Sequence, residues 1–175
     1  GFCLVGSEMC IRDRIKPGEE VILLAPFWVS YSAIVLMADG IPKILKSDIS
    51  NDFKVSAKQI DDAISEKTKM IIINSPNNPS GSIYNEKELY EIASVIKKYP
   101  NVFVLSDEIY EHINYGSEHV SFASIEGMYD RTITVNGIAK AFAMTGWRIG
   151  YLGAPIWIAK AVSYTHLRAH ETEAY

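Results

Sequence analysis

Cysteine is scarce in this sequence of 175 residues, and both of its two cysteines, Cys3 and Cys10, precede residue 15. Residues 15–162 therefore hold neither a disulfide framework nor a thiolate metal site. Basic residues are in the minority, with 17 lysines and arginines against 21 aspartates and glutamates, so no basic surface points to nucleic acid. No apolar run approaches the roughly 20 residues of a membrane-spanning helix. We expect a cytoplasmic protein that binds neither nucleic acid nor a membrane.

Strand-like and helix-like segments alternate along residues 15–162. The expected strands are Glu20–Ala25, Pro42–Leu45, Met70–Asn74, Val102–Ser106, Thr132–Asn136 and Ile149–Gly153. The expected helices are Val29–Ala38, Ala57–Ser65, Glu86–Tyr99 and Ile156–Val162. Ser56 with Gln59, and Asn85, offer N-caps for the second and third helices. This alternation predicts an α/β fold with a mostly parallel sheet and helices on both faces.

The most informative segment of the sequence runs from Asn136 to Tyr151. Lys140 lies there between a strand-like stretch and small residues, where it can be desolvated. A desolvated lysine loses its proton more easily and becomes a nucleophile for aldehydes. Arg148, eight residues later, offers a guanidinium fork that suits a phosphate. A reactive amine near a phosphate receptor is what pyridoxal 5′-phosphate (PLP) requires.

Three other segments place polar or aromatic residues just after apolar, strand-like runs. Asn78 lies in the turn 75–81, Asp107 and Tyr110 follow residues 102–106, and Trp28 follows residues 20–24. In parallel α/β sheets, ligands bind at the carboxyl ends of strands. An amide, a carboxylate, a phenol and an indole there could bind a flat, charged cofactor. Taken singly, they are more typical of an ordinary turn, a helix N-cap with a core tyrosine, and a buried indole.

The order and placement of these four segments resemble the fold-type I PLP enzymes, specifically class I aminotransferases of the bacterial aspartate aminotransferase branch. The resemblance covers about residues 15–162. It implies a three-layer PLP-transferase-like large domain, whose mostly parallel sheet has one antiparallel strand, here Ile149–Gly153. The domain is expected to be incomplete, because the family's Gly-rich phosphate loop, its substrate-carboxylate arginine and a tyrosine from the partner subunit have no counterpart here. The parent protein is expected to be a homodimer.

The resemblance also implies roles for individual residues. Lys140 looks like the lysine that forms the internal aldimine and later moves a proton between the substrate α-carbon and C4′ of the cofactor. Asp107 looks like the partner of the pyridinium nitrogen, whose negative charge keeps the ring an electron sink. Trp28 looks like the residue that stacks on the ring.

Three further residues complete the implied cofactor site. Tyr110 and Asn78 look like the donors to the phenolic oxygen of the cofactor, and Arg148 looks like the clamp on its phosphate. In relatives, the peptide bonds that correspond to Asn78–Pro79 and Ala25–Pro26 are often cis, an isomer that only proline tolerates well.

The two ends of the sequence differ from the family. Residues 1–14 and 163–175 both resemble translated sequencing-adapter read-through. We expect them to be non-native tails that flank a partial PLP-binding large domain at residues 15–162. Genuine divergent termini are the alternative.

The expected reaction is PLP-dependent transfer of an amino group between an amino acid and a 2-oxo acid, aspartate-type or related. A PLP-dependent β-lyase on the same fold and a non-catalytic PLP-binding regulatory domain are alternatives. The fragment by itself is expected to be inactive, because part of the family's site is missing. No metal site is expected, since the sequence groups no further ligands with His112 and His119.

Overall fold

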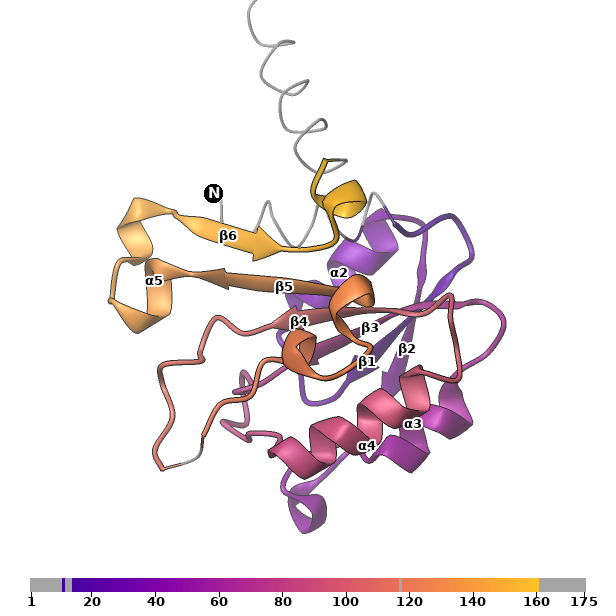
Figure 1. Cartoon of the computed structure of the whole chain (residues 1–175), viewed down its shortest axis with the longest axis horizontal. Helices are drawn as coiled ribbons and strands as arrows, with labels where there is room; N and C mark the ends of the chain where they lie inside the picture. Colours follow the sequence, from indigo (N-terminus) through magenta and orange to yellow (C-terminus); the bar gives the residue numbers. More distant parts are fainter. Residues whose placement is uncertain (1–10, 12–13, 117, 161–175) are drawn as a thin grey trace, which may run out of the picture.

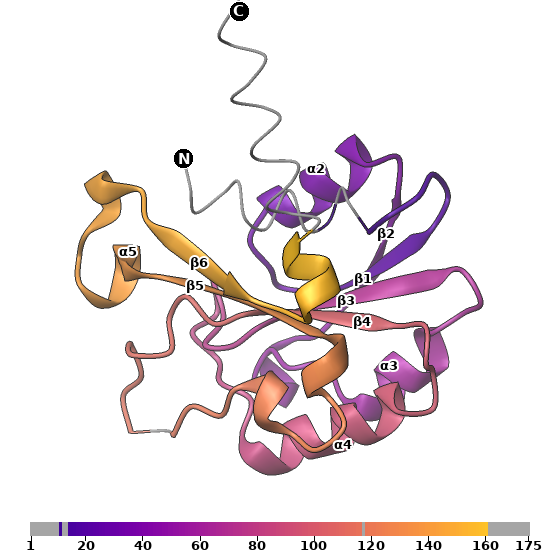
Figure 2. The same ribbon diagram turned by 45° about the horizontal axis from the view of Figure 1, so that its top comes forward.

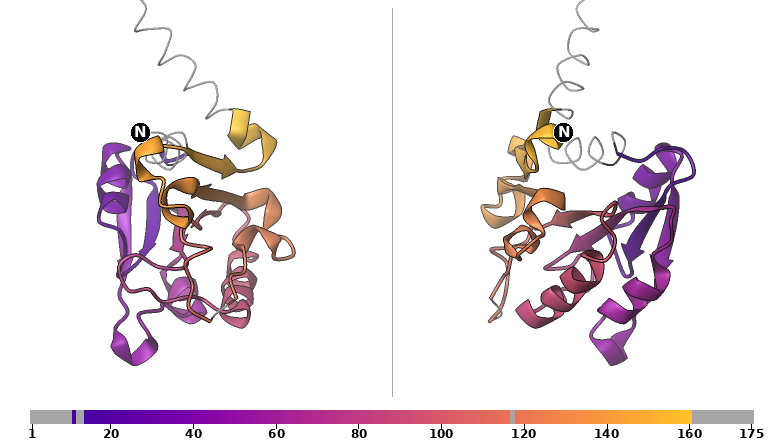
Figure 3. Two further views of the ribbon diagram at one scale, coloured as in Figure 1. Left: turned by 90° about the vertical axis from the view of Figure 1, so that its left-hand side faces the viewer. Right: turned by 45° about the vertical axis from the view of Figure 1, so that its right-hand side comes forward.

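The computed structural model describes residues 11, 14–116 and 118–160, and they form one six-stranded sheet with helices on both faces (Figure 1). The strands are β1 (Glu20–Leu24), β2 (Ile41–Leu45), β3 (Thr68–Asn74), β4 (Phe103–Asp107), β5 (Thr132–Gly137) and β6 (Gly150–Gly153). Their order across the sheet is β2-β1-β3-β4-β5-β6, so β2 and β6 lie at opposite edges (Figure 3). The α/β architecture expected from the alternating segments is confirmed.

The helices are α2 (Ser30–Met37), α3 (Ala57–Ala63), α4 (Glu86–Ile96) and the short α5 (Ile138–Ala141), and residues 156–160 are also helical. Helices α3 and α4 cover one face of the sheet, whereas α2 and residues 156–160 lie on the other (Figure 2). None of the helices within the described residues has both the length and the apolar character that crossing a membrane requires.

Successive residues of the central strands point into two separate cores. In β1, Ile22 packs with the α3 and α4 side of the sheet, and Val21 and Leu23 pack with the α2 side. In β3, Ile71 packs on the α3 and α4 side and Met70 on the α2 side. Side chains alternate along a strand, so a strand covered on both faces must be apolar throughout. The unbroken apolar runs in the sequence are explained by this double burial.

Strand pairing is parallel from β2 to β5 and antiparallel between β5 and β6. The antiparallel strand expected at Ile149–Gly153 is therefore confirmed, one residue shorter. Asn74 is in register with Asp107, and Asp107 with Val135. Because β1, β3, β4 and β5 run in the same direction, their carboxyl ends lie on the same side of the sheet. The segments that follow these strands therefore begin close together.

The ends of the helices follow local capping chemistry. Ser56 and Gln59 form a capping box at α3, and Asn85 and Glu88 form another at α4, so both expected caps are confirmed. The expected helix Glu86–Tyr99 was too long at its carboxyl end. The helix stops at Ile96 and a turn leads to Pro100, whose ring disfavours helical geometry in the residue before it.

Two described residues of the expected amino-terminal tail contact the fold. Ile11 is fully buried in the α2-side core beside Ile15. The guanidinium carbon of Arg14 lies 4.6 Å from the ring centroid of Trp157. The rest of residues 1–14, and all of residues 163–175, lie outside the described residues, so the expectation of non-native tails stays a prediction.

Candidate active site

A pocket of about 200 Å³ lies at the carboxyl ends of the parallel strands. It is lined by all of the residues that the sequence analysis selected, namely Trp28, Asn78, Asp107, Tyr110, Lys140 and Arg148. They come from four different segments, at the carboxyl ends of β1, β3, β4 and β5 or just after them. The structure therefore brings together residues that are up to 120 positions apart in the sequence.

Asp107 is the last residue of β4 and is only 7% exposed. Its Oδ2 accepts a hydrogen bond from the Tyr31 hydroxyl at 2.5 Å, and its Oδ1 accepts one from the Ile109 backbone N–H at 3.2 Å. Burial raises the pKa of the Asp107 carboxyl, as does the nearby charge of Glu108, while the two hydrogen bonds lower it. The net effect is a raised pKa.

Asn74 connects the Asn78 turn to Asp107. Its side-chain Nδ2 donates to the Asp107 carbonyl oxygen at 2.9 Å, and its Oδ1 accepts from the Asn78 backbone N–H at 2.8 Å. The Asn78–Pro79 bond is cis, as is Ala25–Pro26, so both expectations are confirmed, and Ser75–Pro76 is a third cis bond. The turn that carries Asn78 is thus fixed to the β4 end by the amide of a buried strand residue.

Trp28 is half-buried at the mouth of the pocket. Its ring meets the Tyr31 ring edge to face, with 5.5 Å between centroids and 86° between planes. Such T-shaped pairs fix the orientation of both rings. An indole held in this way has a defined face for a flat ligand.

Lys140 lies in α5, and its side chain is exposed. The expectation of a desolvated lysine is therefore wrong for this chain. Small neighbours alone do not bury a lysine, and residues 142–149, which follow it, are themselves exposed and leave it uncovered. The amine lies 5.8 Å from the Tyr110 ring centroid, so it does face the pocket.

Arg148 borders the pocket beside Thr145 and is also exposed. It ends the 3₁₀ turn Thr145–Trp147 with a left-handed φ of 55°, and its Nη1 donates to the Thr145 carbonyl oxygen at 3.4 Å. A non-glycine residue in this region of φ is uncommon. The turn presents the guanidinium at the rim, where it can contact an anion.

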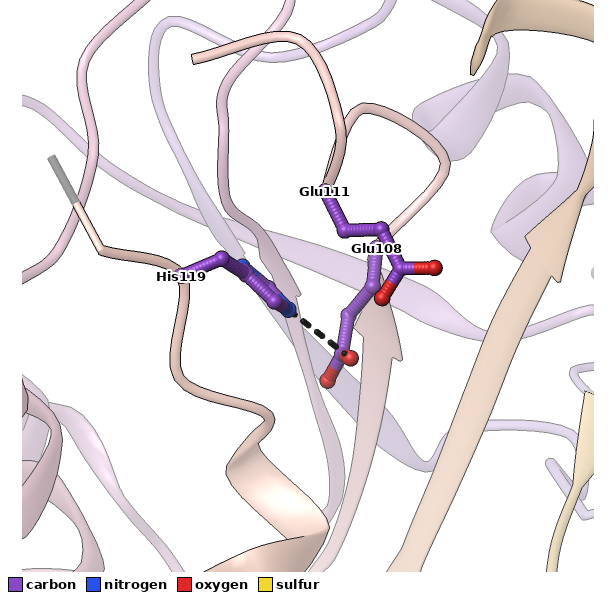
Figure 4. A group of neighbouring side chains, drawn as sticks. All are labelled: Glu108, Glu111 and His119. Atoms are coloured by element: carbon purple, nitrogen blue, oxygen red, sulfur yellow. Dashed lines mark hydrogen bonds and ion pairs between the residues drawn. The ribbon is translucent and has the colours of Figure 1, made fainter. Parts of the chain in front are cut away.

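Glu108 anchors the segment that follows Asp107 (Figure 4). Its Oε1 accepts hydrogen bonds from the hydroxyls of Ser106 and Ser121 and from the Phe122 backbone N–H, at 2.8 to 3.1 Å. Its Oε2 lies 3.1 Å from Nε2 of His119. This fully hydrogen-bonded carboxylate closes the loop between residues 108 and 122.

Glu108, Glu111 and His119 offer ligand atoms within 4.8 Å of one another, so His119 does have neighbours that the sequence did not group with it (Figure 4). The Glu108 oxygens are already committed to protein donors. The cluster is explained as a structural connection between β4 and the loop.

Sequence reasoning missed three polar residues of the pocket: Tyr31, Asn74 and Thr145. Tyr31 had a detectable signal, because it follows Trp28 by only three residues and the turn that leads into α2 brings the two rings together. Asn74 had a weaker one as the polar end of an apolar strand. Nothing in the sequence around Thr145 distinguishes it.

Comparisons with known proteins show which family this chain resembles. The model of the family "Aminotransferase class I and II" matches residues 4–166. A bifunctional aspartate aminotransferase and glutamate/aspartate-prephenate aminotransferase from Petunia hybrida is 51% identical over 80% of this chain, and an aspartate/prephenate aminotransferase from Nitrosomonas europaea is 45% identical over 87%. The chain spans only 29% and 39% of the length of these two relatives.

Solved structures show the same likeness. The aspartate aminotransferase from Rhizobium meliloti superposes with a TM-score of 0.93 and 38% identity, over 97% of this chain and 43% of that one. The aspartate aminotransferase from Thermus thermophilus with maleate gives a TM-score of 0.89 at 38% identity, over 93% and 42%. From the family match, the identities and the shared fold, we conclude that this chain belongs to the class I and II aminotransferases.

Proposed function

We propose that the parent protein of this chain is a PLP-dependent aminotransferase that moves an amino group between an amino acid, aspartate or a related one, and a 2-oxo acid. The observation that carries the proposal is the convergence of a lysine, a buried aspartate, an aromatic ring and an arginine on one pocket. The curated relatives named for aspartate and prephenate support this substrate class. Residues 15–162 are the cofactor-binding part of the large domain.

The donor set of the pocket fits the chemistry of PLP. A buried carboxylate, Asp107, suits a cationic ring nitrogen, and the exposed guanidinium of Arg148 suits a phosphate. The indole of Trp28 suits the face of a flat ring. When bound, PLP supplies an aldehyde for the incoming amine and a ring that accepts electrons.

The residues of this chain would then have separate tasks. Lys140 would supply the amine that holds the cofactor and, with the substrate bound, the base for the proton of the substrate α-carbon. Asp107 would hold a proton on the ring nitrogen, and its burial in a site of low dielectric would strengthen that pairing. Asn78 and Tyr110 would hold the phenolic oxygen of the cofactor as hydrogen-bond donors. Location in the cytoplasm and a homodimeric parent stay predictions.

Covalent capture of the cofactor tests the proposal. Incubation of the chain with PLP, reduction with borohydride and peptide mapping should find the cofactor attached to Lys140. Lys140→Ala should lose the label, and Lys87→Ala, which removes an exposed lysine on α4, should keep it. A label spread over other lysines, with none at Lys140, would sink the assignment.

A further inference from the structure

Tyr31 is a polar residue of the pocket that has no role in the proposed reaction so far. Its side chain is 1% exposed, yet its hydroxyl reaches the pocket and donates to Asp107 Oδ2 at 2.5 Å. This is a charge-assisted hydrogen bond inside the protein, a class that is stronger than a neutral one. Its position next to the proposed ring-nitrogen partner suggests that it acts through that partner.

The fold fixes the position of the Tyr31 hydroxyl. The ring belongs to the α2-side core, where it packs with Val21, Leu23 and Val35. It also meets the Trp28 ring edge to face, and the Tyr31 backbone N–H donates to the Trp28 carbonyl oxygen at 3.0 Å. A ring held by a core on one side and by an indole on the other cannot turn its hydroxyl away.

The Tyr31 hydroxyl and burial shift the pKa of Asp107 in opposite directions. Burial favours the neutral acid and raises the pKa of Asp107, and the hydrogen bond from Tyr31 is the larger of the two contacts that lower it. The pKa of Tyr31 is itself raised well above its usual range by burial and by the charge of Asp107, so the phenol keeps its proton and remains a donor.

Other titratable groups surround the pair without replacing this contact. Glu108 follows Asp107 and adds negative charge, while Tyr110, Lys140 and Arg148 line the same pocket. The Ile109 backbone N–H is the second donor, at the longer distance of 3.2 Å. Tyr31 is thus the one side chain among the described residues that donates directly to this carboxylate.

We propose that Tyr31 is a positioning residue, which keeps Asp107 ionised and fixes the direction of its carboxylate toward the ring nitrogen of the cofactor. This inference rests on the proposed function. Tyr31 would not touch the reacting atoms; it would determine the charge and orientation of the group that does.

The coupling can be tested without cofactor by carbon NMR of the carboxyl groups in ¹³C-aspartate-labelled chain, with Asp107→Asn assigning the resonance. Tyr31→Phe should move the titration midpoint of Asp107 to higher pH. Replacement of Tyr31 by 3-fluorotyrosine, a stronger donor of nearly the same size, should move it to lower pH. An unchanged midpoint in Tyr31→Phe would overturn the inference.

Cofactor binding gives the second readout, and Tyr84→Phe is the matched control. Tyr84 is also buried, and its hydroxyl donates to the Val55 carbonyl oxygen outside the pocket. Tyr31→Phe should weaken PLP binding about tenfold, the scale of a hydrogen bond to a charged group, whereas Tyr84→Phe should not. Equal affinity of Tyr31→Phe and the unmodified chain would refute the positioning role. Failure of the proposed function is seen separately, as absence of the label at Lys140 in the unmodified chain.

Discussion

At the scale of single residues, the surroundings of Asp107 are the most consequential. The carboxylate is buried at a strand end, and its net pKa is raised because burial outweighs the hydrogen bonds that it accepts. A folded state that raises the pKa of an acid binds its proton more tightly than the unfolded chain does. The ionised form of Asp107, which the proposed function requires, therefore lowers the free energy of unfolding.

Asp107→Asn should reveal this cost through the pH dependence of stability. Protonated Asp107 favours the folded state, so its contribution is present at low pH and is lost as the pH rises through the raised pKa. Asparagine does not titrate. Urea unfolding at a series of pH values should therefore show the unmodified chain losing stability, relative to Asp107→Asn, from acidic toward neutral pH. A difference that is constant with pH would contradict the expectation.

For single residues, the sequence allowed some features of the site to be predicted and not others. Asp107, Asn78 and Trp28 could be selected because each follows an apolar run that reads as a strand. The partnership of Tyr31 with Asp107 could not, because the two residues are 76 positions apart and no local pattern connects them. The exposure of Lys140 was likewise hidden, since coverage depends on distant segments.

At the scale of elements, strands were predicted within one or two residues because apolar runs bounded by Gly, Pro and polar residues mark them well. The helix α5 was missed, since four residues are too few to show a helical period. The 3₁₀ turn Thr145–Trp147 was not predicted, for the same reason. These short elements carry Lys140 and precede Arg148, so the residues of the site could be predicted from the sequence but its local backbone conformation could not.

The capping box of α4 allows a prediction for one element. Asn85 Oδ1 accepts from the Glu88 backbone N–H at 2.9 Å, and Glu88 Oε2 accepts from the Asn85 backbone N–H at 2.8 Å. Asn85→Ala should lower the free energy of unfolding by about 1 kcal/mol, because an orphan helix donor loses its partner. Asn85→Ser, which keeps a capping oxygen, should recover most of it. Equal urea midpoints for Asn85→Ala and the unmodified chain would contradict this.

At the scale of the whole molecule, one margin carries a series of exposed large apolar side chains. Along residues 142–151 they are Phe142, Met144, Trp147, Ile149 and Tyr151, from 38% to 69% exposed. Apolar surface of this kind marks places where another surface packs. The relatives are more than twice as long as this chain, so they have further polypeptide available.

We therefore expect the chain alone to associate with itself as its concentration rises, because exposed apolar area is removed from water on contact. Sedimentation velocity over a range of concentrations would measure this. Trp147→Lys combined with Tyr151→Lys should reduce association, whereas Lys58→Ala, on the exposed side of α3, should not. A monomer at every concentration would show that this margin is not adhesive.

The order of strands in the sheet also bears on how the molecule is made. After β1, every strand pairs with one that precedes it in the chain: β2 and β3 with β1, β4 with β3, β5 with β4, and β6 with β5. During synthesis from the amino end, each new strand could thus pair with a strand that is already present, without rearranging earlier pairs. Lys140 follows β5 and emerges after Trp28, Asn78 and Asp107. Lys140 would then emerge after the strands that precede Trp28, Asn78 and Tyr110 have been made, and Arg148 would emerge eight residues later.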